Sequence, residues 1–510
     1  LLFFIMENIF KDIKEEYKVG GLYGSSANYI ISNIANNFDN TIIVLNNNSE
    51  VINFNEVFSA FVTNKKNISL FLDIEGFPYE NSIQDIYIIS ERLKSYYNLL
   101  HHNNNIIVTT YSSIIKKVIN KELIKSYFKE INKETKYNVI INILKDFKYE
   151  RTDKVLNKGE YSIKGPIIDI YNLLNDKPIR INFDDDKVQS IKEFDINNQR
   201  SINEVDFLFL SPAVEFIIDD EAIKNYKKNV PLFFDQDYIN DIEYSKVVSH
   251  YSHPHINNIL PLFNNKLMSF IDFPGNNHNV IISNRNIFNQ LKKIYERYIE
   301  YYNKNHKIKY ILDPSAILTN PKDIQSAFLG YFKVELSNYK VVESHSHYNS
   351  TTRKLPPLII DNKSKDPYLK LKNYINSSTN KLLIFIERKS LQLEIIKLLN
   401  DLNISLKIFD NVHKAIKANE MISIVSTKLD EGFIDFSSKI TFISSKDIFG
   451  NRSVNIPKKN SNRILNSYIN DISVLDIDDP LVHDNYGVGR YKGLINMDIE
   501  GIETELIKIE

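Results

Sequence analysis

The feature that most constrains the fold of this chain is a run of short β-strand patterns between residues 147 and 200. Its segments are rich in β-branched and aromatic residues, and clusters of Asn, Asp, Gly and Lys that favour turns separate them. Strands this close in sequence have no helical crossover between them, so they predict an antiparallel meander. One face of such a sheet can remain in water. The predicted strands are residues 161–163, 167–171, 178–183 and 187–194.

The length and charge of the chain set the limits for everything else. Its 510 residues predict several domains, each able to bury a core. The net charge is −1, so nucleic acid would have to be held by a local patch. The absence of cysteine excludes disulfides and thiolate metal sites and agrees with a reducing cytosol. No apolar run approaches the roughly 20 residues of a membrane span, so no membrane partner is expected.

The other patterns predict an α/β multidomain protein. Strands and helices alternate over residues 22–119, which favours a parallel sheet. Helices are predicted at residues 8–18, 29–38, 89–100, 112–119 and 286–302. Closely spaced glycines between short β patterns near the end predict a small barrel. The expected divisions are 1–122 and 212–348 for a first α/β domain, 123–211 for an inserted antiparallel β module, 349–455 for a second small α/β domain, 456–475 for a linker and 476–510 for the start of the barrel.

Several short motifs lie in order along the meander. They include Tyr-Glu-Arg-x-Asp, Gly-Glu-Tyr-Ser-Ile-Lys-Gly, Ile-Ile-Asp-Ile-Tyr and Pro-Ile-Arg-Ile-Asn-Phe. In this order they resemble the UvrA-interaction module shared by the excision-repair protein UvrB and the transcription-repair coupling factors (Mfd). Near the end, Val-His-x-x-Tyr-Gly-Val-Gly-Arg-Tyr-x-Gly resembles the start of the CarD-like RNA-polymerase-interacting domain of the coupling factors. UvrB has no such domain, so the chain resembles the UvrB-like N-terminal portion of a coupling factor.

A glycine-rich loop precedes the helix predicted at residues 29–38, as in phosphate-binding loops. A working loop also needs a lysine for the β- and γ-phosphates and a hydroxyl residue for magnesium. Aligned with the nucleotide loop of UvrB, those two positions hold Ala27 and Asn28. The sequence therefore predicts a tight turn that packs a helix on a sheet and binds no ATP. The residues of this degenerate loop are Gly21, Gly24, Ser25, Ser26, Ala27 and Asn28.

The resemblance implies a UvrA-binding surface on the meander. Lys164 and Arg180 fall where the family carries two basic residues of that surface. Phe183 is present near the family's aromatic contact, but the matching position is Asp184, which implies a mainly electrostatic contact. Since arginine offers a planar fork for carboxylates and lysine only a point charge, Lys164 is expected to be the weaker cation.

Two outcomes are open for Arg180. If it contacts UvrA, exchange for glutamate should abolish capture and leave the meander folded, because like charges then face each other across the interface. The alternative is that Arg180 only pairs with neighbours such as Asp169 or Glu193, in a surface ion pair worth about 0–1 kcal/mol.

The resemblance also implies a contact with the β subunit of RNA polymerase. By position, Met497 matches a leucine on the family's polymerase-binding surface, and Arg490 and Ile499 are close to it in sequence. An exposed apolar side chain beside a strand edge suits β-augmentation. The alternative is that Met497 belongs to the barrel core.

The implied function is recruitment of UvrA to RNA polymerase stalled at DNA damage, in the bacterial cytoplasm. In the family, motor domains beyond this portion use ATP and Mg to translocate on double-stranded DNA and displace the polymerase. The chain is expected to be a fragment. Because its nucleotide loop is degenerate, we predict no catalytic residue in it, and we expect no metal or cofactor. Two alternatives are a UvrB-like helicase component, which Ala27 and the CarD-like end oppose, and a motor-less adaptor. Sequence beyond Glu510 would distinguish the adaptor from a coupling factor, because a complete phosphate-binding loop there would indicate a motor.

Overall fold

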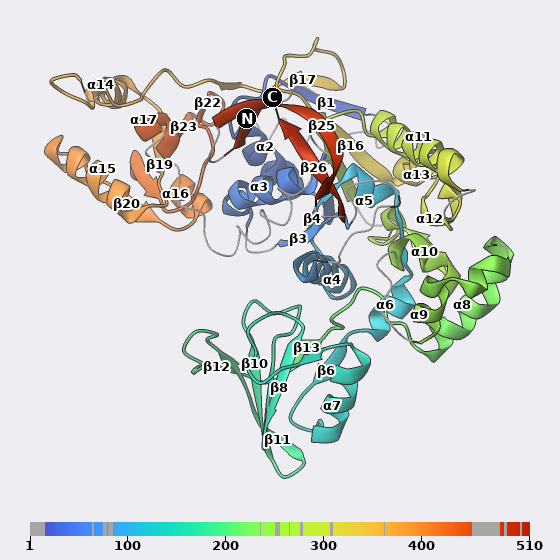
Figure 1. Cartoon of the computed structure of the whole chain (residues 1–510). Helices are drawn as coiled ribbons and strands as arrows, with labels where there is room; N and C mark the ends of the chain where they lie inside the picture. Colours follow the sequence, from blue (N-terminus) through green and yellow to red (C-terminus); the bar gives the residue numbers. More distant parts are fainter. Residues whose placement is uncertain are drawn as a thin grey trace. The chain divides into compact units, whose positions relative to one another are not determined.

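The computed structural model describes residues 16–63, 66–74, 79, 85–234, 236–249, 256–264, 266–275, 279–306, 310–361, 363–450, 480–483, 487–499 and 502–509. They fall into two compact units. The first unit holds the described residues up to Gly450 except Tyr79, and the second holds the strands from Pro480 onward. The chain forms several separate β-sheets accompanied by helices, which confirms the predicted α/β multidomain class (Figure 1).

A parallel seven-stranded sheet forms the centre of the first domain, in the order β17-β1-β16-β15-β2-β4-β3. Its central strands β2 (Asn40–Leu45) and β4 (Asn105–Thr110) are buried along their whole length, as strands between two helical layers should be. β15 (Asn279–Ser283) and β16 (Tyr331–Leu336) follow the meander in sequence, so the chain returns to the first sheet. The other strands are β1 (Glu16–Gly20), β3 (Asn67–Phe71) and β17 (His347–Asn349).

Helices with apolar residues at helical spacing cover this sheet. Side chains cap three of the four main helices: Asn47 accepts from the Glu50 N–H, Asp85 from the Tyr87 N–H and Asn286 from the Asn289 N–H. The four main helices are α2 (Ser26–Ala35), α3 (Asn48–Phe58), α4 (Ile86–His101) and α11 (Ile287–Asn305). The predictions for residues 89–100 and 286–302 are thereby confirmed, and the helix predicted at 29–38 is present but lies three residues earlier.

Two helix predictions are wrong in part. Residues 16–18 of the predicted helix 8–18 belong to strand β1, and residues 8–15 lie outside the described part. The helix predicted at 112–119 ends early as α5 (Tyr111–Ile115), and β5 (Lys117–Ile119) pairs antiparallel with β14 (Leu267–Ser269). Val118 and Ile119 are β-branched and buried, which suits a strand better than a helix.

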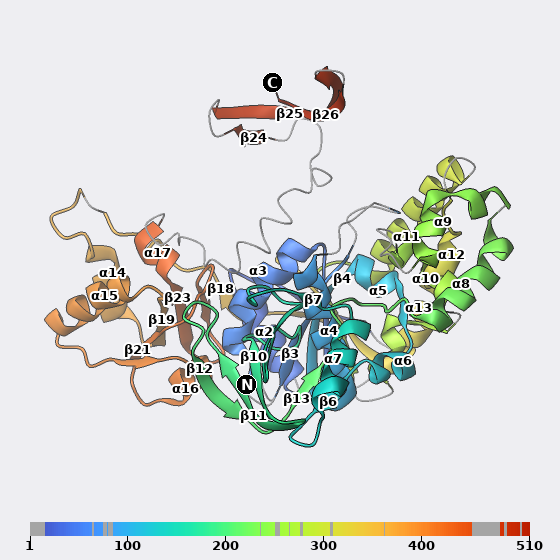
Figure 2. The same cartoon turned by 60° about the horizontal axis from the view of Figure 1, so that its bottom comes forward.

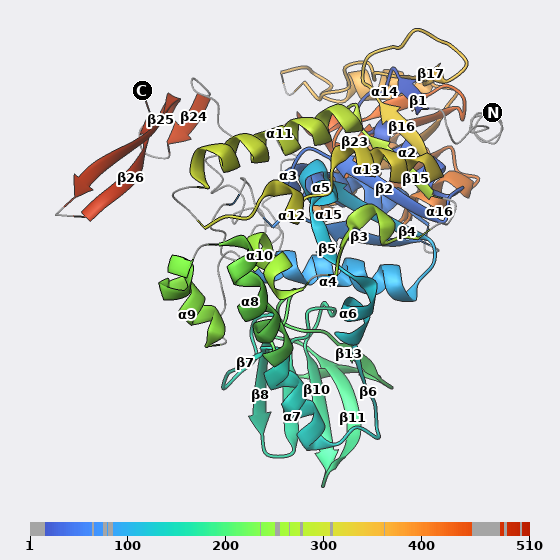
Figure 3. The same cartoon turned by 90° about the vertical axis from the view of Figure 1, so that its right-hand side faces the viewer.

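A group of shorter helices follows the meander and lies together beside α11 (Figure 3). α8 begins behind Asp219, which accepts from the Ala222 N–H, and contacts α10. These helices are α8 (Asp220–Phe233), α9 (Ile242–Val248), α10 (Ile256–Phe263), α12 (Pro314–Ile317) and α13 (Pro321–Ala327), with 3₁₀ turns η1 (Ser59–Phe61), η2 (Gln236–Asn240), η3 (Phe270–Asp272) and η4 (Phe328–Gly330) in the domain.

The meander is present as predicted, within a six-stranded sheet of order β12-β11-β10-β9-β8-β7. The four predicted strands are β8 (Glu160–Lys164), β9 (Ile167–Ile170), β10 (Ile179–Asp184) and β11 (Lys187–Phe194), and each pairs antiparallel with the next. Sequence patterns missed the two edge strands. These are β12 (Ser201–Val205), antiparallel to β11, and β7 (Glu150–Arg151), parallel to β8.

One face of the meander is covered by α7 (Tyr137–Asp146), which buries Ile140 and Leu144. The chain enters the module through α6 (Lys121–Ser126) and β6 (Lys129–Ile131) and leaves it through β13 (Leu208–Leu210). β6 and β13 pair antiparallel, so entry and exit lie side by side.

The second α/β domain has its own sheet, of order β18-β22-β23-β19-β21-β20 (Figure 2). Four of its strands run parallel, in agreement with the predicted small α/β domain, while β18 and β22 run antiparallel to their neighbours. The strands are β18 (Thr352–Arg353), β19 (Lys381–Phe385), β20 (Lys407–Phe409), β21 (Ile422–Val425), β22 (Phe433–Asp435) and β23 (Ile440–Ser444), and the helices are α14 (Leu369–Ser377), α15 (Lys389–Asp401), α16 (Val412–Lys417) and α17 (Ser445–Phe449).

The second unit is a three-stranded antiparallel sheet of β24 (Pro480–His483), β25 (Gly487–Ile499) and β26 (Ile502–Ile509). The predicted barrel detail is not confirmed, because these strands do not close into a barrel within the described residues.

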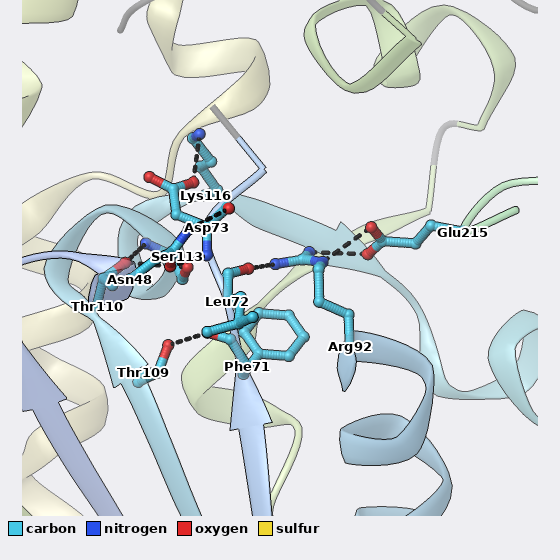
Figure 4. A network of polar contacts seen from close by, with 10 residues as sticks. All are labelled: Asn48, Phe71, Leu72, Asp73, Arg92, Thr109, Thr110, Ser113, Lys116 and Glu215. Carbon is cyan, nitrogen blue, oxygen red and sulfur yellow. Dashed lines mark hydrogen bonds and ion pairs between the residues drawn. The ribbon is translucent and has the colours of Figure 1, made fainter. Parts of the chain in front are cut away.

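Helix α4 carries a buried ion pair that joins three parts of the first unit (Figure 4). Arg92 donates Nε and Nη2 to the two carboxylate oxygens of Glu215, at 2.8 and 2.7 Å, and Nη1 to the Leu72 carbonyl at 2.8 Å. Its guanidinium lies 3.9 Å from the Phe71 ring centroid. Desolvation is the largest single influence and opposes its charge, but Glu215 together with Tyr96 and Asp73 outweighs it and raises the pKa of Arg92. Glu215 follows β13 by five residues, so the pair ties the exit of the module to α4.

Exchange of Arg92 for methionine should lower the free energy of unfolding by about 3–5 kcal/mol, because the carboxylate of Glu215 would stay buried without its cation. Urea unfolding followed by circular dichroism measures the loss. Lys292→Met is the control: Lys292 is 71% exposed, and its removal should change stability by less than about 0.5 kcal/mol. Equal stabilities for the two variants would contradict the role of the pair.

Candidate functional site

The glycine-rich loop precedes a helix, as predicted; the element before it is strand β1 instead of the predicted helix. Gly21 and Gly24 have φ of +66° and +52°, a region that side chains disfavour. Asn28 is buried and donates its amide to the Phe54 carbonyl at 3.4 Å, while Ala27 is half-buried. The loop is thus a turn that packs a helix against the sheet, without a side-chain cation at the lysine position.

Backbone groups that could hold a phosphate are already bonded within the protein. The Ser25 N–H donates to the Glu431 carbonyl at 2.9 Å, and the Glu431 N–H donates to Ser25 Oγ at 3.2 Å. The N–H groups of Ser26 and Asn28 donate to carbonyls of the loop itself. Free N–H groups at a helix start are what an anion binds. The carbonyl of Glu431, from the second α/β domain, therefore takes that role here.

The same contact is close enough to require glycine. A Cβ on Gly24 would lie 2.7 Å from the Gly432 carbonyl oxygen. Beside the loop, the Tyr29 ring lies 5.1 Å from the Phe442 ring, and Phe61 of the first domain belongs to the same buried cluster as Phe442. The two domains thus share one apolar core at this point.

A second polar network lies at the carboxyl ends of β3 and β4 (Figure 4). Lys116 Nζ and Asp73 Oδ1 are 2.8 Å apart, and Asn48 exchanges two hydrogen bonds of 2.8 Å with the backbone of Asp73. Thr110 Oγ1 caps α5 by accepting from the Ser113 N–H at 3.1 Å. These groups satisfy one another, so the network holds strand ends together.

On the meander, Lys164 and Arg180 lie on the same face of the sheet. Arg180 stands opposite Asp169 in the antiparallel register, and Asp169 stands opposite Ser162, two residues before Lys164. Residues directly opposite each other share a face, as do residues two apart in a strand. Lys164 is exposed at the end of β8. The structure therefore brings the two predicted basic residues to one surface.

Arg180 is already engaged in that surface. It donates Nε and Nη2 to the carboxylate of Asp169 at 2.7 and 2.9 Å, and Nη1 to the Gln199 carbonyl at 3.1 Å. Its guanidinium lies 4.7 Å from the Phe194 ring. The hydrogen bond with Asp169 raises the pKa of Arg180. Asp169 and Glu193 were the two neighbours expected to pair with Arg180. The structure contains the pair with Asp169, whose side chain is only 2% exposed.

The predicted aromatic contact falls on the other side of the sheet. Phe183 is 5% exposed and meets the Tyr137 ring edge-on, with centroids 5.0 Å apart. Asp184 is exposed beside the turn at Asp185, which has φ of +51°. The ring of Phe183 therefore belongs to the core under α7, and the surface at this turn is acidic.

Sequence reasoning missed Lys192 on this face. Lys192 stands opposite Arg180, and its side chain is 35% exposed, 3.7 Å from Glu204. A bulge between Asn182 and Phe183 shifts the register by one residue, which brings Lys192 to this position instead of Ile191.

The polymerase-contact residues lie on β25. Arg490 is exposed opposite Pro480, while Met497 and Ile499 stand opposite Thr504 and Ile502 on β26. β24 pairs only as far as Arg490, so within the described residues the part of β25 that holds Met497 has one neighbouring strand. The surroundings of the side chains of Met497 and Ile499 lie outside the described part.

Among the described residues, no group of three His, Asp or Glu side chains could hold a metal ion. In the same residues, no helix combines the length and apolar character that crossing a bilayer requires.

Comparison with known proteins gives three domain matches in order along the chain. Residues 130–216 match the UvrB interaction domain, residues 374–448 the MFD D3 domain, and residues 475–510 the CarD-like/TRCF RID domain. Together they define a class of protein that combines a UvrB-type interaction domain with a CarD-like domain.

Curated relatives carry the name of one family. The chain is 24% identical to the transcription-repair-coupling factor of Haemophilus influenzae over 92% of its length, and 22% identical to that of Escherichia coli over 97%. It is 25% identical to that of Bacillus subtilis over 71%. The resemblance to the transcription-repair coupling factors is thereby confirmed. The chain spans 41% and 43% of the length of the first two relatives.

We predict no binding of Mg-ATP to this chain in the micromolar range by titration calorimetry, because the loop lacks its cation and the Ser25 N–H is bonded to Glu431. The double exchange Ala27→Lys and Asn28→Thr restores both missing groups but leaves that contact in place, so it should not restore binding. Micromolar affinity in the original chain would contradict the prediction. If the double variant gained affinity for Mg-ATP, the missing side chains alone would explain the lack of binding, and the Ser25–Glu431 contact would not contribute.

Arg180→Glu should destabilise the meander by about 3–5 kcal/mol, since it places a second carboxylate beside the buried Asp169. This differs from the expectation that the exchange leaves the module folded. Lys164→Glu, at an exposed strand end, should change stability by less than about 0.5 kcal/mol. Urea unfolding of both variants is the measurement, and an undiminished midpoint for Arg180→Glu would show that its fork contributes nothing.

Proposed function

We propose that this chain is the recruiting portion of a transcription-repair coupling factor. Its inserted module captures UvrA, and its last strands contact the β subunit of RNA polymerase. The observation that carries the proposal is the order of the matches: a UvrB interaction domain followed by a CarD-like domain in one chain. The loop between β1 and α2 supports a recruiting role without nucleotide, because the second α/β domain covers it.

Within the module we assign the principal UvrA contact to Lys164. Its ammonium is exposed and has no ion-pair partner among the residues that the structure describes. Arg180 lies on the same face, but its guanidinium donates two hydrogen bonds to the Asp169 carboxylate. Its positive charge is therefore less available to a partner, and its main role is to hold this surface in place. This assignment reverses the expected order of the two cations. Lys192 adds positive charge opposite Arg180.

The polymerase contact is proposed at β25. A strand edge with one described neighbour can accept a further strand, and side chains beside it then select the partner. Arg490, Met497 and Ile499 are the residues that we assign to this contact.

The remaining steps belong to the whole protein. Since the chain spans about two fifths of its curated relatives, we propose that domains outside it translocate on double-stranded DNA and displace the polymerase with ATP and Mg. A UvrB-like helicase component is the weaker alternative, because no UvrB-like loop chemistry remains at Ala27 and Asn28 and a CarD-like domain is matched.

Capture of UvrA from the same organism tests the proposal. Lys164→Glu should weaken capture at least about tenfold, because a like charge would face the acidic partner surface that the lysine implies. Lys154→Glu, an exposed lysine in the same module, is the matched control and should bind as the unchanged chain does. Binding by surface plasmon resonance measures both, after circular dichroism has shown equal folding. Undiminished capture by Lys164→Glu would remove this residue from the site.

A further inference from the structure

The module meets helix α4 along a seam that buries one lysine. Lys158 is 8% exposed and donates Nζ to Ser90 Oγ at 2.8 Å and to the Leu173 carbonyl at 3.0 Å. Ser90, on α4, donates its hydroxyl to the same carbonyl at 2.7 Å. Two donors thus share one acceptor. Among the described residues, no carboxylate is within ion-pair distance of Lys158.

The nearest carboxylates serve another cation. Lys94 of α4 lies 3.2 Å from Glu91 Oε1 and 2.9 Å from Asp176 Oδ1, so it holds one acid from each side of the seam. Tyr171 of the module lies with its ring 5.8 Å from Lys158 Nζ and donates its hydroxyl to the Asp176 carbonyl. With Tyr87 of α4, which acts on Tyr171, these are the titratable and charged groups that face Lys158.

This setting disfavours the charged form of Lys158. An ammonium has three protons to donate, and among the described residues it finds two acceptors, Ser90 Oγ and the Leu173 carbonyl. Burial, and next the charge of Lys94, lower the pKa of Lys158 to about 8. A neutral amine would fit better, since it can accept from the Ser90 hydroxyl and still donate to the Leu173 carbonyl.

We propose that Lys158 is a charge-controlled latch between the interaction module and helix α4. Neutral Lys158 closes the seam, and protonated Lys158 loosens it; on closing, the ammonium gives one proton to water. The latch concerns how the module is attached, so it stands whether or not the module captures UvrA.

The rest of the attachment does not respond to pH near neutrality. At the exit of the module, Tyr149 donates its hydroxyl to the Ser211 carbonyl at 2.8 Å, and Asn172 Oδ1 accepts from the Ser211 N–H at 3.2 Å. Burial raises the pKa of Tyr149, so this network stays uncharged. When the seam loosens, the module therefore remains tied at its exit and can pivot there.

The sign of the pH effect follows from the lowered pKa. An open seam exposes Lys158 to water, where a lysine titrates near pH 10.4. Between about pH 8 and pH 10.4 the open form carries the proton and the closed form does not, so closure gains with rising pH. From pH 7 to pH 9 the ratio of closed to open seam should rise about tenfold.

Hydrogen exchange measured by mass spectrometry on the full chain tests the latch. Peptides covering residues 86–96 of α4 and 155–175 of the module lie on the two sides of the seam and report its opening. After correction for intrinsic rates, protection in the unchanged chain should rise about tenfold from pH 7 to pH 9. Lys158→Met keeps the stem without the charge and should be protected at both values. Lys158→Arg, always charged, should be open at both.

Lys154→Met, an exposed lysine in the same loop, is the control and should follow the unchanged chain. Equal protection of the unchanged chain at pH 7 and pH 9 would overturn the latch. So would lower protection in Lys158→Met than in the unchanged chain at pH 7, because the charge would then be holding the seam closed. If Lys158→Met fails to fold, the pH series of the unchanged chain and the arginine variant decide.

Discussion

The arrangement of the first unit depends on a buried ion pair, in which neither charge is tolerated without the other. Arg92 and Glu215 are both buried, so each would be costly without the other, and together they also hold the Leu72 carbonyl. One partner stands on helix α4 and the other directly after the exit of the inserted module. The pair therefore holds the exit of the module against helix α4. Since the entry strand β6 pairs with the exit strand β13, both connections of the meander to the first domain are held at this place.

Much of the fold could be predicted because the patterns are local. Alternating β-branched residues and turn clusters located the four strands of the meander, and helical spacing located α4 and α11. Short apolar runs were less informative. A strand such as Lys117–Ile119 has too few residues for the spacing of its apolar side chains to distinguish a strand from a helix. Its place is decided by its partner Leu267–Ser269, about 150 residues away in sequence.

The candidate sites were predictable in chemistry and less so in contacts. The residues Ala27 and Asn28 were enough to predict a tight turn without a phosphate cation, yet nothing local indicates that Glu431 covers it. On the meander, the structure brings Lys164 and Arg180 to one face, and their contact with UvrA stays a prediction. Asp169 was among the expected neighbours of Arg180, but the sequence could not give the bidentate geometry of that pair. Nor could it give the bulge that turns Lys192 to the same face, because a shift of one residue exchanges the two faces of a strand.

The contact between Gly24 and Gly432 has a consequence for how this chain can change over generations. At Gly24 the neighbouring domain imposes a constraint that does not depend on nucleotide. Any side chain at Gly24 would push against a carbonyl of that domain, whereas Ala27 carries no cation for a phosphate. We expect descendants of this sequence to vary at Ala27 and keep glycine at Gly24, so that the loop retains the outline of a phosphate cradle for reasons of packing.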